Sequence, residues 1–67
     1  MNNIKRKLEE LAYEYAREGK EALAERKLNN AALSMQQAIN HFQEAGNLEQ
    51  YARSLNMLGV IYAALGN

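Results

Sequence analysis

A single histidine is the only side chain in this sequence that suggests acid–base or metal chemistry. His41 is followed by Glu44, about one helical turn further along the chain. One histidine and one carboxylate form neither a catalytic triad nor a metal site, because both need further groups. The sequence therefore predicts that His41 is an exposed or half-buried residue on a helix.

The sequence also lacks the motifs of nucleophilic, phosphate-binding and calcium-binding proteins. Ser34, the first of two serines, has no base beside it to activate its hydroxyl. There is no cysteine, no aspartate and no glycine-rich phosphate loop, and the eight glutamates do not follow the spacing of a calcium loop. We therefore expect no enzymatic activity, no cofactor and no metal ion.

The charges are balanced and give no electrostatic reason to bind nucleic acid or a membrane. Eight lysines and arginines match eight glutamates. The only basic run is Lys-Arg-Lys at residues 5–7, and two glutamates follow it, which is typical of a solvated helix start. The longest uncharged stretches, 28–43 and 54–67, are shorter than the ~18 apolar residues of a membrane span. We expect a soluble, cytoplasmic protein with neither nucleic acid nor membrane as a partner.

The composition predicts an all-α fold. Alanine, leucine and glutamate dominate, proline is absent, and there are only four glycines. Such a chain favours helices and offers few of the tight turns that a sandwich or barrel needs. With 67 residues, it is expected to form a single domain over residues 1–67, whose core alone gives marginal stability.

The first helix is expected over residues 3–18. Four apolar residues recur at spacings of four, three and four, which is the stripe of an amphipathic helix. These residues are Ile4, Leu8, Leu11 and Tyr15. A helix that continues through Gly19 is the alternative, because a glycine inside a helix costs only about 1 kcal/mol. The apolar stripe changes its phase after Gly19, which favours a turn there.

Two further helices are expected over residues 21–45 and 48–65, each antiparallel to the one before it. Gly46 is suited to end the second helix in a left-handed conformation, and Asn47 is suited to cap the third. Gln50 follows Asn47 at the spacing of a capping box. The expected core contains ten residues. They are Leu8, Leu11, Tyr15, Leu28, Met35, Ile39, Phe42, Leu55, Leu58 and Tyr62.

The first and third helices share a residue pattern at a distance of 47 positions. The matching pairs are Leu8 and Leu55, Leu11 and Leu58, Ala12 and Gly59, Tyr15 and Tyr62, and Gly19 and Gly66. This order of leucine, small residue, aromatic and glycine resembles the first helix of a tetratricopeptide repeat, most closely over residues 46–67. Ala31, Met35 and Ala38 are similar to the series in the second helix of that repeat.

The resemblance implies one and a half helical hairpins that form the N-terminal part of a longer repeat array. The usual repeat has about 34 residues, and the longer spacing here resembles a variant with an extended second helix found in bacterial signalling proteins. In such a fold the small residues Ala12 and Gly59 lie where a neighbouring helix crosses closely. We therefore expect Gly59→Leu to destabilise the fold by several kcal/mol.

Tetratricopeptide stacks bind a partner peptide or helix in a groove lined by their first helices. The resemblance therefore implies a protein-interaction function, with groove residues on the side of each first helix that faces away from its second helix. These candidates are Arg6, Glu9, Tyr13 and Arg17, and then Arg53, Asn56, Val60 and Ala63. The Asn56 amide could hold a peptide main chain, and it could equally be a polar group that faces water.

Self-association is the alternative function. The third helix is apolar on two sides, but the chain supplies only one neighbour for it. We therefore expect a homodimer or larger assembly through Leu58, Ile61 and Leu65, with a second helix that overhangs both shorter helices. A nucleic-acid binder with a basic helix tip is a third hypothesis, and it requires binding that weakens steeply with added salt.

Overall fold

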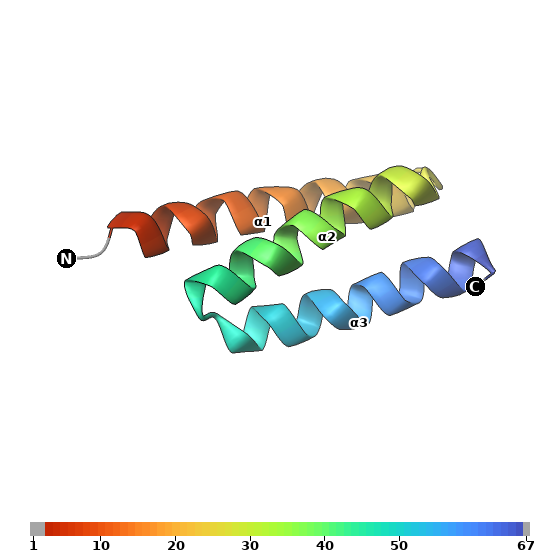
Figure 1. Ribbon diagram of the computed structural model, residues 1–67. Coiled ribbons are helices and arrows are strands. Elements are labelled where there is room, and N and C mark those ends of the chain that lie inside the picture. Colours follow the sequence, from red (N-terminus) through yellow and green to blue (C-terminus); the bar gives the residue numbers. More distant parts are fainter. Residues whose placement is uncertain (1–2, 67) are drawn as a thin grey trace.

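The computed structural model describes residues 3–66, and within this range it consists of three α-helices without a strand. α1 spans Asn3–Ala24, α2 spans Leu28–Ala45 and α3 spans Leu48–Leu65. Consecutive helices run antiparallel, and α2 packs against both α1 and α3 (Figure 1). None of these helices is long and apolar enough to cross a membrane. The predicted all-α arrangement of three antiparallel helices is confirmed.

Gly19 lies inside α1, so the predicted helix boundaries at residues 18 and 21 are wrong. A Cβ atom at Gly19 would lie 2.8 Å from Met35 Cε and 3.4 Å from Ala31 O. The missing side chain therefore lets α1 and α2 approach closely, which offsets the roughly 1 kcal/mol that glycine costs within a helix. Gly59, where a close helix crossing was predicted, has no atom within 4 Å of its Cβ position.

α1 ends instead in a turn at residues 25–27, a stretch without glycine, proline or asparagine. Arg26 takes a left-handed φ of 62°. Hydrogen bonds from Arg26 N–H to Leu23 O (3.0 Å) and from Lys27 N–H to Ala22 O (2.8 Å) close the turn. This is a Schellman motif with arginine at the position that glycine usually occupies, and for that reason the local sequence did not indicate it.

Arg26→Gly is expected to stabilise the protein by about 0.5–1 kcal/mol. The left-handed conformation strains any residue with a Cβ atom, whereas glycine adopts it freely and loses only part of this gain to backbone entropy. Thermal unfolding followed by circular dichroism should give a higher midpoint for Arg26→Gly and little change for Arg26→Ala. A lower midpoint for Arg26→Gly would contradict the left-handed turn.

The turn between α2 and α3 was predicted correctly at Gly46 and Asn47. Gly46 ends α2 with a left-handed φ of 75°, and Asn47 Oδ1 accepts a hydrogen bond from Gln50 N–H (3.2 Å). Asn47 Nδ2 also donates to Glu9 Oε2 (2.9 Å). The start of α3 is therefore capped locally and is also tied to α1.

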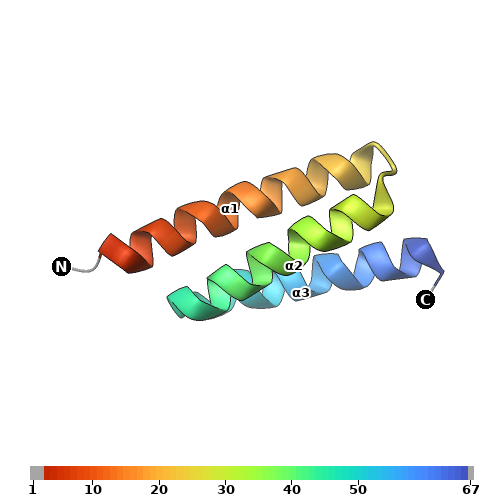
Figure 2. The same ribbon diagram turned by 45° about the horizontal axis from the view of Figure 1, so that its top comes forward.

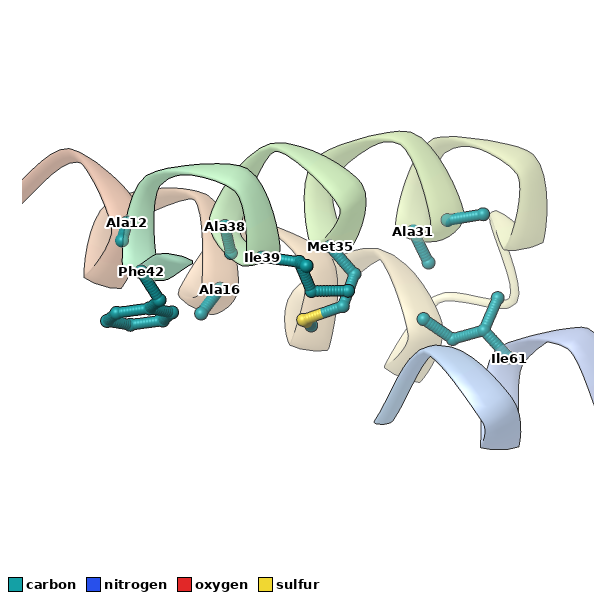
Figure 3. Packing of buried hydrophobic residues seen from close by; sticks show 9 residues of the cluster. Ala12, Ala16, Ala31, Met35, Ala38, Ile39, Phe42 and Ile61 are labelled. Atoms are coloured by element: carbon teal, nitrogen blue, oxygen red, sulfur yellow. The ribbon is translucent and has the colours of Figure 1, made fainter. Parts of the chain in front are cut away.

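The core lies between α2 and the two helices that flank it. Phe42, Met35 and Ile61 are its largest fully buried side chains, and alanines surround them (Figure 3). These small residues are Ala12, Ala16, Ala31, Ala32 and Ala38. Small side chains at a helix contact let the helix axes approach closely. The result is a thin molecule, whose Cα trace measures 43 × 18 × 12 Å.

The buried sides of α1 and α3 are rotated relative to the prediction. Leu11, Leu55 and Tyr62 were expected in the core, but they are 44%, 43% and 36% exposed. On α1 the contact with α2 runs through Ala12 and Ala16, because only small residues fit at this short distance. The other seven expected core residues are buried or half-buried.

Leu58, Ile61 and Leu65 were predicted to contact a second copy, but they pack against the core of their own chain. Ile61 is 0% exposed, and Leu58 and Leu65 are partly buried beside the same core. The prediction was wrong because α2 covers the side of α3 that was expected to be bare. α1, with 22 residues, is also longer than α2, with 18, and its N-terminal end extends beyond α2 (Figure 2).

Candidate protein-binding groove

A groove with a volume of about 600 Å³ lies between α1 and α3, across one side of α2. α1 and α3 form its walls because they flank α2 (Figure 1). The lining residues come from all three helices. They are Tyr13, Ala16, Arg17 and Lys20 of α1, Met35 of α2, and Gln50, Arg53, Ser54, Asn56 and Met57 of α3.

The floor of the groove is apolar apart from one hydroxyl group. Ala16, Met35 and Ser54 are buried there, and Met57 is half-buried beside them. Met35 reaches this position because Gly19 has no side chain in its path. Methionine side chains adapt to the shape of their neighbours, so this floor can accommodate apolar side chains of different shapes.

The walls carry the cations Arg17, Lys20 and Arg53 and, among the described lining residues, no carboxylate. Arg17 pairs with Glu21 (3.3 Å), and Arg53 pairs with Glu49 (3.1 Å). The side chains of both pairs are between 62% and 72% exposed, and such pairs contribute only about 0.2–0.5 kcal/mol. A carboxylate of a bound molecule can therefore compete for either arginine.

Tyr13 and Asn56 add recognition groups to the two walls. The ring of Tyr13 packs edge-on against Phe42, with centroids 5.0 Å apart at 82°. Tyr13 nevertheless stays 50% exposed, so an oriented aromatic surface is available to a partner. Asn56 is exposed on α3, where its amide can donate and accept hydrogen bonds.

Four of the predicted groove residues lie outside the groove. Arg6, Val60 and Ala63 are exposed but do not line it. Glu9 is half-buried, and its carboxylate accepts the hydrogen bond from Asn47. Glu9 therefore holds α1 against the turn between α2 and α3 and does not face the groove.

Sequence reasoning missed six of the lining residues: Ala16, Lys20, Met35, Gln50, Ser54 and Met57 were not among the groove candidates. Lys20 was missed because the first helix was expected to end at residue 18. Since α1 continues beyond that residue, Lys20 lies on the same side of the helix as Tyr13 and Arg17. Ser54 is buried, and no local pattern marks a single serine as part of a groove floor. Its burial depends on where α2 lies.

His41 is half-buried, as predicted, and it takes part in packing. Its Nδ1 donates to Gln37 O (2.8 Å), and its ring lies 5.6 Å from the Tyr15 ring at an angle of 54°. Over residues 3–66, no three His, Asp or Glu side chains gather as metal ligands. His41 thus contributes to the contact between α1 and α2.

Comparison with known proteins gave no relative of this chain. No protein-family model, no curated protein and no solved structure matches it. The function must therefore be inferred from the geometry of the groove and from the residue pattern that α1 and α3 share.

Proposed function

We propose that this protein is a protein-interaction module that binds a peptide or helix of a partner in the groove between α1 and α3. The observation that supports this most strongly is the position of four residues selected from the sequence. Tyr13 and Arg17 on one wall, and Arg53 and Asn56 on the other, line the same groove. Aromatic and arginine side chains are the residue types that most often dominate binding at protein interfaces.

The charge of the groove favours a partner segment that carries carboxylates. Arg17, Lys20 and Arg53 surround a space with no acidic residue among its described lining residues. The methionines on the floor, Met35 and Met57, favour apolar side chains between these carboxylates. An acidic peptide with interspersed apolar residues satisfies both requirements.

The groove also offers hydrogen bonds that do not depend on the partner's side chains. Gln50 and Asn56 lie on the α3 wall, and each amide can donate to and accept from a peptide main chain. Main-chain contacts of this kind give affinity, while the charged and apolar positions select the sequence.

The wider context of the proposal comes from the resemblance to tetratricopeptide repeats over residues 46–67. In this context the chain is the N-terminal part of a longer repeat array in a bacterial signalling regulator that works in the cytoplasm. Such arrays use the surface of their first helices for binding, and α1 and α3 are the helices that form the groove walls.

Peptides selected from a random display library on the immobilised protein test this proposal. The selected sequences should be rich in Asp and Glu next to apolar residues. The double variant Arg17→Ser/Arg53→Ser should weaken the binding of such a peptide by about tenfold or more, because it removes one charge from each wall. Fluorescence anisotropy at constant ionic strength measures the change in affinity.

Arg6→Ser is the control for this experiment, because Arg6 is exposed on α1 but does not line the groove. This variant should bind the peptide as well as the wild type does. An equal loss in Arg6→Ser would mean that only the net charge matters, and an unchanged affinity in the double variant would mean that the groove is not the binding site. Either result would overturn the proposal.

A further inference from the structure

α3 is held less firmly in the core than α2 is. Across its described length, 48–65, α3 buries two residues, Ser54 and Ile61, whereas α2 buries seven. Its other core contacts come from half-buried side chains such as Met57 and Leu58. The position of a helix in a protein depends mainly on the packing of its apolar face. Polar contacts with neighbouring helices therefore matter more for the position of α3 than for that of α2.

One such contact joins the start of α3 to α1. Asn47 directly precedes α3, and its side-chain amide makes two hydrogen bonds. Oδ1 accepts from Gln50 N–H (3.2 Å), and Nδ2 donates to Glu9 Oε2 (2.9 Å). Because the bond to Gln50 fixes the amide, its Nδ2 group is held towards α1. The bond to Glu9 is partly buried and has a carboxylate as its acceptor, which makes it stronger than a bond between neutral groups.

The Glu9–Asn47 bond lies at one end of the groove. α1 and α3 both run antiparallel to α2, so the two walls are parallel to each other (Figure 1). On α1, Glu9 precedes Tyr13 by about one helical turn, and on the other wall Asn47 precedes Gln50 by a similar distance. Tyr13 and Gln50 are the first lining residues of the two walls in chain order. The bond therefore connects the walls where the groove begins, and it takes up no space inside the groove.

We propose that the Glu9–Asn47 bond sets the distance between the two walls, which makes Glu9 a positioning residue for peptide binding. The effect on affinity rests on the proposed function, whereas the effect on the free protein does not. The buried residues of α1 begin at Ala12, so Glu9 precedes the part of α1 that α2 holds. Without the bond, this end of α1 can move away from α3. A peptide that contacts both walls then loses some of its contacts.

Distances between two spin labels test the effect on the free protein. The chain has no cysteine, so labels can be attached at Glu14→Cys on α1 and Ala52→Cys on α3, two exposed positions outside the groove. Pulsed electron paramagnetic resonance should give a narrow distance distribution when Glu9 is present. Glu9→Ala should broaden this distribution and shift it to longer distances. Glu9→Gln should leave it unchanged, because its amide oxygen still accepts from Asn47.

The affinity for a selected acidic peptide tests the consequence for binding. Glu9→Ala should raise the dissociation constant by about threefold to tenfold, as expected for the loss of one partly buried hydrogen bond. Glu9→Gln should bind at least as tightly as the wild type. If Glu9 acted only through its charge, both variants would bind an acidic peptide more tightly. Glu10→Ala is the control, because Glu10 is exposed on α1 outside the groove and its loss changes the net charge equally; it should not weaken binding.

Asn47→Ser tests the other partner of the bond. Serine also caps a helix, but its side chain is too short to reach Glu9. In this background Glu9→Ala should therefore cause no further loss of affinity.

An unchanged distance distribution in Glu9→Ala, binding by that variant as tight as that of the wild type or tighter, or an equal loss in Glu10→Ala would overturn the proposal. If no acidic peptide binds the wild type, the proposed function fails. The distance measurement then decides by itself whether the Glu9–Asn47 bond sets the separation of the walls.

Discussion

Ile61→Glu is expected to detach α3 and to remove most of the stability of this protein. Ile61 is 0% exposed and lies close to Ala31 at the start of α2 (Figure 3). A carboxylate at this position would lose its water without gaining a partner, which costs at least about 3 kcal/mol. A domain of this size has only a few kcal/mol of net stability. Urea unfolding followed by circular dichroism should therefore show little or no folded baseline.

Val60→Glu is the control for this variant, because Val60 is next to Ile61 but is 55% exposed. Surface substitutions of this kind change the free energy of unfolding by about 0.5 kcal/mol or less. The Val60→Glu variant should therefore unfold at nearly the same urea concentration as the wild type. Equal destabilisation by the two substitutions would refute the packing of Ile61 between α2 and α3.

Gly19→Leu is expected to lower the free energy of unfolding by about 3 kcal/mol or more, the second large effect. Its Cβ alone would lie 2.8 Å from Met35 Cε and 3.4 Å from Ala31 O. The terminal methyl group of Met35 can move aside, but the backbone of α2 can yield only if the two helices separate. The midpoint of urea unfolding should fall accordingly.

Gly59→Ala is expected to have the opposite effect, although sequence reasoning placed a close helix crossing at Gly59. No atom lies within 4 Å of its Cβ position, so alanine meets no obstacle there. It should gain up to about 1 kcal/mol from its better helix propensity. A destabilised Gly59→Ala, or a Gly19→Leu variant as stable as the wild type, would contradict the structure.

The turn between α2 and α3 could be predicted from the sequence because its signals are local. Gly46 adopts the left-handed conformation that glycine tolerates best, and Asn47 accepts the capping hydrogen bond from Gln50. Both properties belong to the residue types themselves. The three-helix order followed from this turn and from the apolar periodicity of the chain.

The turn between α1 and α2 could not be predicted in the same way. Arg26 occupies the left-handed position, and an arginine there gives no local signal. Gly19 gave a false signal, because glycine serves both turns and close helix contacts, and only the position of Met35 distinguishes the two. The true buried side of α1 was missed for the same reason: it is set by the short distance to α2, which favours Ala12 over Leu11.

The groove was predicted in part. Tyr13, Arg17, Arg53 and Asn56 were found because the resemblance indicated which side of each first helix is used and helical periodicity then selected the residues. Ser54 could not be found in this way, since its burial depends on how α3 lies against α2. Periodicity therefore identifies the walls of such a groove, while the floor needs the tertiary structure.

The proposed binding surface is tested most directly by mapping a selected acidic peptide onto the isotope-labelled protein through its amide chemical shifts. We predict that the largest shift changes occur on both walls together, at Arg17 on α1 and at Asn56 on α3. Leu33, which is 63% exposed on α2 outside the groove, should change little. Largest changes around Leu55 and Tyr62, or on one wall alone, would contradict a groove formed by α1 and α3.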